Sequence, residues 1–280
     1  MENSFSKKAL KIPLDKRSKT IRKSIIKGII ESGRGHFGSA MSTVEILRVL
    51  YDDFMNYDPK NPKKEKRDRL ILSKGHGCLS LYSILADKGF FSKKYLSKVG
   101  HPNSILGGHP EYLKVPGIEA STGALGHGLS IASGIALSLK IKKSKSKVFV
   151  ILGDGEINEG SNWEAAMSAS KHKLTNLKVF IDYNKIQSYG FTKNVVDLEP
   201  LSLKWKSFGF EVSEVNGHNI KQIKKNIKKF YQKKDKKPSL TICHTIKGKG
   251  FSFAENNPFW HHKNSFTQED IKKFDESLSE

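Results

Sequence analysis

Strand-like segments alternate with helical patterns through the second half of this sequence, and this alternation restricts the possible folds more than any other feature. Short segments rich in apolar and β-branched residues stand at 147–153, 177–184, 210–215 and 239–246. Helical patterns separate them, at 161–171, 200–208 and 219–233. Strands that alternate with helices form a parallel sheet that is covered on both faces. We therefore expect an α/β protein with three layers, α/β/α, around a mainly parallel sheet.

The first part of the chain reads as helical. Isoleucines recur on one face of residues 18–32, as in an amphipathic helix. Residues 41–56 predict a second helix, which Ser42 or Thr43 would cap ahead of Glu45.

A further strand and a long loop complete the pattern. RLILS at 69–73 predicts a strand, and apolar helices are expected at 78–88 and 129–140. Between these helices, residues 100–125 are rich in glycine and proline. Loops of this length in a compact domain are usually functional or disordered, and the two histidines among apolar residues favour a functional loop.

Length and cysteine content indicate the class of protein. A chain of 280 residues can form a large domain that buries roughly 70–75% of its unfolded surface, so it needs no disulfides. We expect one domain over 1–280, with a helical extension at about 1–35. Cys78 and Cys243 lie far apart, as is typical of a reducing compartment, and no apolar run predicts a signal peptide or a membrane span. We expect a cytoplasmic protein with no membrane partner.

The net charge of +21, from 49 lysines and arginines against 28 acidic residues, suggests an anionic partner. The lysines gather at 60–69, 140–147 and 221–237, each on or beside an expected surface element. Lysine-rich faces without interleaved arginine and aromatic residues are weak evidence for binding nucleic acid. Solvated surfaces are the simpler interpretation, so we expect no nucleic-acid partner, and whether the charge serves phosphorylated substrates or only solubility stays open.

Two polar residues follow the ends of expected strands. Asp154 lies in GDGEINEG after one strand, and Asn184 lies in IDYNKIQ at the end of another. If these strands are neighbours, the side chains converge, and their oxygens with a nearby backbone carbonyl suit Mg²⁺ that takes further ligands from phosphates. Gly153 and Gly155 leave room for a phosphate beside the backbone. A lone GDG is commonly an ordinary strand–turn–helix, but the paired asparagine favours a metal–diphosphate site.

This GDG and asparagine pair resembles the thiamine diphosphate motif, and the resemblance extends over nearly the whole chain to the N-terminal, diphosphate-binding part of transketolases. Six segments resemble family blocks in family order: SGRGHFGSAMSTVEILRVLY, DRLILSKGHGCLSLYSILADKG, GGHPE, STGALGHGLSIASGIAL, GDGEINEGSNWEAAMSAS and HTIKGKGFSFAENNPFWHHK. The WHHK ending resembles the form found where transketolase is encoded as two chains. The resemblance implies the thiamine diphosphate-binding fold, with thiamine diphosphate and Mg²⁺ as cofactors.

The same resemblance implies which residues bind the cofactor. Asp154, Asn184 and the main-chain carbonyl of Ile186 would hold Mg²⁺ against the two phosphates. The other matching positions are Gly153 and Gly155 beside the diphosphate, Gly123 and Leu125 near the thiazolium, and Glu159 at a subunit interface, where it would relay cofactor state between sites. Taken alone, Glu159 is also explained as an acid that interacts with the dipole at a helix start.

Four histidines match positions in the family's substrate channel: His36, His76, His109 and His261. Imidazole donates to sugar hydroxyls and phosphate, and it shuttles protons near neutral pH. The resemblance implies that His36 and His76 polarise the sugar near its reactive carbon and that His109 lies near the donor's first hydroxyls. His261 would lie near the diphosphate and the proton-transfer region, and His76 would also contact the cofactor. A lone histidine in a glycine-rich turn is more often structural, but four at matching positions favour function.

Three positions depart from the family pattern. Phe37 stands where many relatives carry proline or a small residue, and we expect it to narrow the floor of the channel. His127 replaces a common glutamine, a change expected to be tolerated near the diphosphate. His262 follows His261 where single-chain enzymes have glycine, and its role stays open.

The resemblance also implies a second chain. In the family, the glutamate that activates the aminopyrimidine ring belongs to the pyrimidine-binding domain, as do the phosphate-binding arginines. This sequence ends at Glu280 without such a domain, so we expect a separate C-terminal chain that binds the pyrimidine, within an α₂β₂ assembly. The implied reaction transfers a two-carbon ketol unit from a ketose phosphate to an aldose phosphate.

Several alternatives fit parts of this pattern. A ketol transferase for an unusual sugar would carry the same motifs. A protein similar to 1-deoxyxylulose-5-phosphate synthase would share the GDG core but normally keeps its domains in one chain, and the α subunit of a 2-oxo acid dehydrogenase lacks these histidine blocks. An inactive subunit that keeps the fold is disfavoured by the intact Asp154, Asn184 and four histidines.

Overall fold

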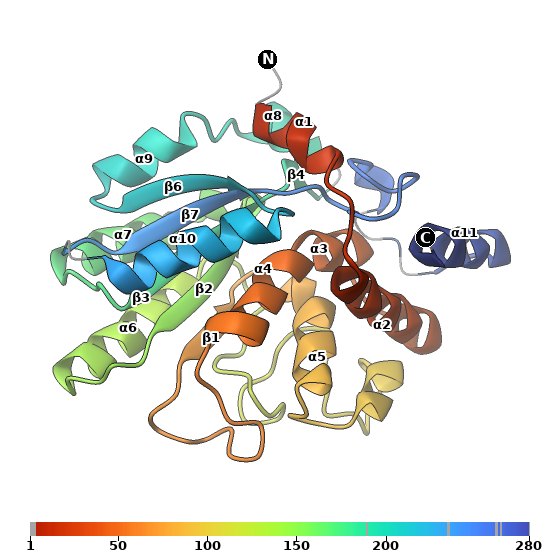
Figure 1. Ribbon diagram of the computed structural model, residues 1–280, viewed down its shortest axis with the longest axis horizontal. Helices are drawn as coiled ribbons and strands as arrows, with labels where there is room; N and C mark the ends of the chain where they lie inside the picture. The colour runs from red at the N-terminus through yellow and green to blue at the C-terminus, as the bar shows by residue number, and fades with distance from the viewer. Residues whose placement is uncertain (1–3, 189, 234–235, 261–262, 264, 280) are drawn as a thin grey trace.

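Five parallel strands form the central sheet of the protein (Figure 1). The computed structural model describes residues 4–188, 190–233, 236–260, 263 and 265–279. The strands, in their order across the sheet, are β1 (Arg69–Leu72), β2 (Val148–Gly153), β3 (Leu177–Tyr183), β7 (Ser239–His244) and β6 (Glu211–Asn216). Every neighbouring pair is parallel, so the predicted α/β fold with a parallel sheet is confirmed.

Helices cover both faces of the sheet, because alternate side chains of the buried strands feed two separate apolar cores. Phe149 and Ile151 of β2 point into the first core, and Val150 and Leu152 point into the second. The first core is covered by α2 (Lys16–Ser32), α3 (Phe37–Ser42), α4 (Val44–Val49), α5 (Cys78–Asp87) and α10 (Ile220–Gln232). The second is covered by α6 (Gly128–Ile141), α7 (Gly160–Lys171) and α9 (Leu201–Ser207).

Several short elements at the edges were not predicted. They are α8 (Thr192–Val195), α11 (Gln268–Ser279) and a hairpin of β4 (Ile186–Gln187) and β5 (Gly190–Phe191). A short first helix, α1 (Ser4–Leu10), lies within the range of the expected helical extension. Single 3₁₀ segments stand at Gly75–Gly77, Lys93–Lys98, Gly155–Asn158 and Pro258–Trp260. The last helix, α11, contacts α2 (Figure 1). Its side chains Phe274 and Leu278 belong to the first core. The shorter of these elements show no periodic pattern, whereas Ile271, Phe274 and Leu278 of α11 do recur with helical spacing and were overlooked.

The predicted start of the 41–56 helix is wrong. Thr43 has helical torsion angles (φ −93°, ψ −6°) and joins α3 directly to α4, so it does not begin a helix. Its hydroxyl donates to carbonyls of the preceding turn, while the Ser42 hydroxyl donates to the carboxylate of Asp182 at 2.7 Å. Neither side chain is a cap, since a tertiary contact and the preceding turn engage both hydroxyls. A π-helical turn, Leu50–Phe54, ends this stretch.

The other predicted helices and all five predicted strands are present close to their expected bounds. Residues 100–125 form the expected loop, with no helix or strand. None of the helices within the described ranges is both long enough and apolar enough to cross a bilayer.

Candidate active site

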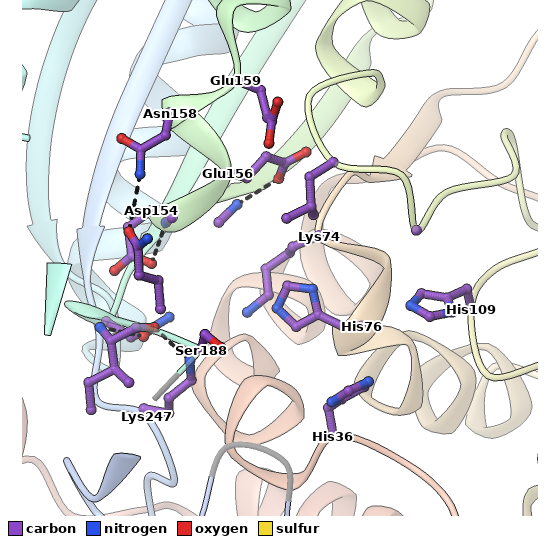
Figure 2. Close-up of a pocket in the computed structure, with 17 residues that line it drawn as sticks. His36, Lys74, His76, His109, Asp154, Glu156, Asn158, Glu159, Ser188 and Lys247 are labelled. Atoms are coloured by element: carbon purple, nitrogen blue, oxygen red, sulfur yellow. Dashed lines mark hydrogen bonds between the residues drawn. The ribbon is translucent and has the colours of Figure 1, made fainter. Parts of the chain in front are cut away.

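A cavity of about 450 Å³ opens beside the carboxyl ends of β2 and β3, where ligands bind in open parallel sheets (Figure 2). All of the predicted site residues that the structure describes line this one cavity: His36, His76, His109, Gly123, Leu125, Gly153, Asp154, Gly155, Glu159, Asn184 and Ile186. The remaining candidate, His261, lies outside the described residues. The structure thus brings the candidates together, and the roles given to them are still predictions.

The cavity has two chemically different ends (Figure 2). The oxygen end is formed by Asp154, Asn184 and the main chain of Ile186, and the imidazole end is formed by His36, His76 and His109. The first set follows the ends of β2 and β3, whereas the second comes from turns and a loop.

At the oxygen end, Asp154 follows β2 directly and is 2% exposed. One carboxylate oxygen accepts from the N–H of Gly155 at 2.8 Å, and the other accepts from the N–H of Lys185. Burial raises the pKa of Asp154 to about 6, against the opposing effect of the Lys247 ammonium. Backbone donors therefore hold a carboxylate that is costly to bury, which is typical of functional sites.

Asn184 and Ile186 add two further oxygens. The amide oxygen of Asn184 accepts from the N–H of Ile186 at 3.2 Å, and its amide nitrogen lies 3.3 Å from the Asp182 carboxylate. One carboxylate, one amide oxygen and one carbonyl fit Mg²⁺ that takes its remaining ligands from phosphates. Within the described ranges, no group of three or more histidine, cysteine, aspartate or glutamate side chains forms a complete metal site by itself.

Two buried lysines line the cavity and were missed by the sequence analysis. The Lys247 ammonium donates to the carbonyl of Ile186 at 2.6 Å, and burial lowers the pKa of Lys247 to about 7 although Asp154 opposes the shift. Lys74 forms an ion pair with Asp182. Both lysines lie in glycine-containing turns soon after a strand, SKGHG and HTIKGKG, and this position was the signal available in the sequence.

Asp182 connects the cavity to the helical layer beside it. Its carboxylate accepts from the hydroxyls of Ser42, at 2.7 Å, and of Thr245, and it pairs with Lys74. Burial alone would raise the pKa of Asp182, but the Lys74 ammonium and these hydrogen bonds hold that pKa below its usual range. The oxygen end therefore rests on a charged network with little freedom to rearrange.

Glu156, also missed by the sequence analysis, holds the glycine-rich loop against the sheet. One carboxylate oxygen accepts from the N–H of Gly126 at 3.0 Å and from the Ser73 hydroxyl, and the other accepts from the N–H of Gly153 at 2.9 Å. Burial raises the pKa of Glu156, and these donors oppose the shift. A single buried carboxylate thus joins three separate segments of the cavity wall.

The imidazole end depends on ring packing. The rings of His36 and His76 meet edge to face with centroids 5.7 Å apart, and those of His36 and His109 are 6.3 Å apart. Gly123 has φ +144°, and a Cβ there would come within 2.9 Å of the His109 ring. Glycine is therefore required at this position for the loop and the imidazole to pack together.

Phe37 does not narrow the floor of the cavity, contrary to expectation. It is fully buried and is not among the residues that line the cavity. The centroid of its ring lies 5.3 Å from that of Phe251, 5.5 Å from that of Trp260 and 5.4 Å from that of Phe274. The side chain points into the first core because it packs there against aromatic residues from the C-terminal part of the chain.

Two other predicted positions lie at the surface. Glu159 is exposed at the rim of the cavity, directly before α7. His127 is exposed ahead of α6 and does not line the cavity. His262 lies outside the described residues.

The parallel sheet, the oxygen donors at its carboxyl edge and the buried lysines define an α/β domain with a polar, charged cavity at the usual ligand position. Comparison with known proteins makes the class specific. The chain belongs to the family described as "Transketolase, thiamine diphosphate binding domain", which matches residues 15–279.

Relatives of similar length are named as single subunits of larger enzymes. The chain is 44% identical to one subunit of the apulose-4-phosphate transketolase of Actinobacillus succinogenes, over 89% of this chain and 90% of the relative. It is 41% identical to "6-deoxy-6-sulfo-D-fructose transketolase subunit SqwG" of a Clostridium species, over 87% and 88%. These relatives confirm the resemblance to the diphosphate-binding half of a two-chain transketolase, and with it the expected enzyme class.

Solved structures agree with the fold. A transketolase from Pichia stipitis superposes with a TM-score of 0.87 at 30% identity, covering 99% of this chain and 41% of that one. The chain therefore spans about two fifths of the length of this transketolase chain.

Proposed function

We propose that this chain is the diphosphate-binding subunit of a two-chain, thiamine diphosphate- and Mg²⁺-dependent ketol transferase that acts on an unusual sugar. The single observation that carries the proposal is the cavity, in which oxygen donors, two buried ammonium groups and three imidazoles face one space. Such a space can take a metal-bound diphosphate at one end and a polyhydroxylated substrate at the other.

The choice of an unusual sugar is supported by the relatives. Two that match this chain along almost their whole length are named for apulose 4-phosphate and for 6-deoxy-6-sulfo-D-fructose. These names favour a branched or sulfonated sugar over the common ketose and aldose phosphates as the substrate. An anionic sugar also suits a chain with a net charge of +21.

At the oxygen end, Asp154, Asn184 and the carbonyl of Ile186 would hold Mg²⁺. The backbone of Gly155 would lie beside the diphosphate, and the ammonium of Lys247 would donate to its oxygens. When bound, thiamine diphosphate supplies the electron sink that ketol transfer requires. Gly123 and Leu125 would approach the thiazolium side of the cofactor.

At the imidazole end, the histidines would bind sugar hydroxyls and move protons. His36 and His76 would donate to the oxygens nearest the reacting carbon, and His109 would orient the first hydroxyls of the donor. His76 would also contact the cofactor. His261 is proposed to act beside the diphosphate on the strength of its sequence motif alone.

We further propose a C-terminal, pyrimidine-binding partner chain and an α₂β₂ assembly. The exposed rim position of Glu159 supports a contact between chains near the cavity. Residues 128–139 of α6 and 160–170 of α7 contain no lysine, although lysines cover much of this chain, and they expose Ile131 and Met167. A lysine-poor, partly apolar face is typical of an interface core.

Two further expectations accompany this proposal. The chain would form one thiamine diphosphate-binding domain, with the N-terminal helices as an extension of it. It would act in the cytoplasm, in agreement with the two buried, unpaired cysteines, Cys78 and Cys243.

The test is a ketol-transfer assay with thiamine diphosphate and Mg²⁺, for this chain alone and with its candidate second chain. Donors would include xylulose 5-phosphate, apulose 4-phosphate and 6-deoxy-6-sulfofructose, with an aldose phosphate as acceptor. The proposal expects activity only in the mixture, with one of the unusual donors preferred. Full activity of this chain alone would contradict the shared site, and a preference for xylulose 5-phosphate would contradict the substrate class.

A further inference from the structure

A buried charged cluster lies outside the cavity, between the helical layer and the segment that carries Lys247. Arg22 of α2, Glu45 of α4 and His218 after β6 are 0%, 1% and 2% exposed. Two nitrogens of Arg22 donate to the Glu45 carboxylate, at 2.6 and 3.0 Å, and Nδ1 of His218 lies 2.7 Å from the same carboxylate. Burying charged groups costs free energy, and replacing a buried ion pair by apolar residues is often neutral for stability. Stability alone therefore does not explain why these three residues are present.

The cluster contacts the backbone of one segment, residues 246–249, at both of its ends. Nε2 of His218 accepts from the N–H of Ile246 at 2.9 Å. Nε of Arg22 donates to the carbonyl of Lys249 at 2.8 Å. Between these two contacts lies Lys247, whose ammonium reaches the carbonyl of Ile186 in the cavity.

The contacts of His218 fix its protonation state. Because Nε2 accepts a hydrogen bond, it carries no proton, so the proton is on Nδ1 and is donated to Glu45. The charged groups that face this ring are Glu45, Arg22 and Lys249. Burial lowers the pKa of His218, which agrees with a neutral ring.

The other hydrogen bonds of the segment's backbone are longer, although the Lys249 side chain also donates to the carbonyl of Leu10 at 2.8 Å. The N–H of Gly248 donates to the carbonyl of Gly38 at 3.3 Å, and the carbonyl of Lys247 accepts from the N–H of Asn256 at 3.0 Å. The His218 and Arg22 contacts are shorter than both, and they are made by side chains that are themselves immobilised by an ion pair.

We propose that Arg22, Glu45 and His218 are positioning residues that hold segment 246–249 so that the Lys247 ammonium stays at the diphosphate position. None of the three lines the cavity, so they act through the backbone of this segment. This inference rests on the proposed function, because it assigns Lys247 to the diphosphate. It has a pH signature, because a protonated His218 cannot accept from Ile246.

The sign of the pH effect follows from the direction of the pKa shift. Because the pKa of His218 is lowered on folding, its contribution to stability is complete above its ordinary value of about 6.5. The contribution is lost as the pH falls through the lower value in the folded protein. Segment 246–249 is therefore expected to loosen in mildly acidic solution.

The first experiment measures the Kd of thiamine diphosphate with Mg²⁺ by calorimetry, on the full chain alone and then with the second chain present. His218→Leu removes the acceptor for Ile246 and should weaken binding by about tenfold, as loss of an outer-shell partner does. His218→Gln keeps an acceptor on the same side chain and should restore most of the affinity.

The matched control is Asn226→Leu. The Asn226 amide donates to the Ser213 hydroxyl and accepts from the Thr241 hydroxyl, both at 2.6 Å, and neither partner belongs to segment 246–249. It should lower the Tm without changing the Kd. If His218→Leu folds and keeps the wild-type Kd, or if both variants weaken binding equally for the same drop in Tm, the positioning role is overturned.

The second experiment needs no cofactor, and it tests the proposal even when His218→Leu does not fold. Amide hydrogen exchange of residues 246–249 is followed from pH 5 to 8 in the wild type and in His218→Gln, after correction for intrinsic rates. Protection that falls below about pH 6.5 in the wild type but not in His218→Gln supports the proposal. Equal pH profiles overturn it. If the wild type shows this profile but binds no cofactor, the proposed function fails and the positioning of the segment stands.

Discussion

The two ends of the cavity are built in different ways. The oxygen end follows two neighbouring strands, and its side chains are held by backbone N–H groups and by the buried pair of Lys74 and Asp182. The imidazole end is assembled from a helix entry, a 3₁₀ turn and a long loop, with ring packing between its histidines. Strand ends restrict a site to one geometry, whereas loops accept variation.

This difference indicates how one domain can serve several sugars. Under the proposed function, the sheet would provide the diphosphate site that a shared cofactor needs. The loops would provide the surface that differs between substrates. We therefore expect changes at the oxygen end to affect cofactor binding, and changes at the imidazole end to affect turnover and the choice of sugar.

The largest effect is expected for Asp154→Ala. It should weaken the binding of thiamine diphosphate with Mg²⁺ by at least about 100-fold, since loss of an outer-shell partner alone costs roughly 10–100-fold. Calorimetry measures this, with the exposed carboxylate variant Asp197→Ala as the control. Wild-type affinity in Asp154→Ala would show that the oxygen end is not the cofactor site.

His109→Gln tests the opposite end. It should lower kcat/KM by about 100-fold through loss of an imidazole that donates and moves protons, with the Kd of the cofactor nearly unchanged. Steady-state assays with each candidate sugar measure this, and His101→Gln, an exposed histidine of the same loop, is the control. A parallel loss of cofactor affinity would remove the distinction between the two ends.

Glu156→Gln tests the junction between the ends. An amide cannot accept on both sides as the carboxylate does, so one N–H of Gly126 or Gly153 would face another donor. Cofactor affinity should fall by about tenfold, which corresponds to about 1.4 kcal/mol. Calorimetry with the exposed variant Glu164→Gln as control checks this, and an unchanged Kd would mean that the glycine-rich loop docks without Glu156.

Phe37→Leu should have the smallest effect on function. It should lower the free energy of unfolding by about 1–2 kcal/mol through lost aromatic packing, and leave the Kd and kcat unchanged for every sugar. Chemical denaturation and the same assays check this, with Phe259→Leu, at an 84% exposed side chain, as control. A changed sugar preference without a loss of stability would show that Phe37 shapes the substrate channel after all.

The sheet and the position of the cavity could be predicted because they depend on local patterns. The strands 147–153 and 177–184 read directly from apolar runs, and parallel pairing then brought Asp154 and Asn184 together. The direction of Phe37 could not be predicted, because its aromatic partners lie more than two hundred residues along the chain.

The site residues that the sequence analysis missed also have partners that lie far away in the sequence. Glu156 has local neighbours but acts on Gly126 and Ser73, and Lys247 reaches Ile186 across 61 positions. Ser42 looked like a helix cap because its true acceptor, Asp182, is invisible to any short window of sequence. Polar side chains choose partners in three dimensions, so their contacts are the part of a site that sequence patterns define least.

The contact between Arg22 and the carbonyl of Lys249 joins residues that are 227 positions apart. During synthesis, at roughly 5–20 residues per second, the guanidinium leaves the ribosome tens of seconds before its acceptor. Until then, Arg22 can pair with Glu45 and donate to the carbonyl of Met41, but its contact with the carbonyl of Lys249 is missing. The helical layer therefore stays incomplete until residue 249 has been synthesised. A chain that terminated earlier would expose these charged groups, and we expect proteases to degrade it.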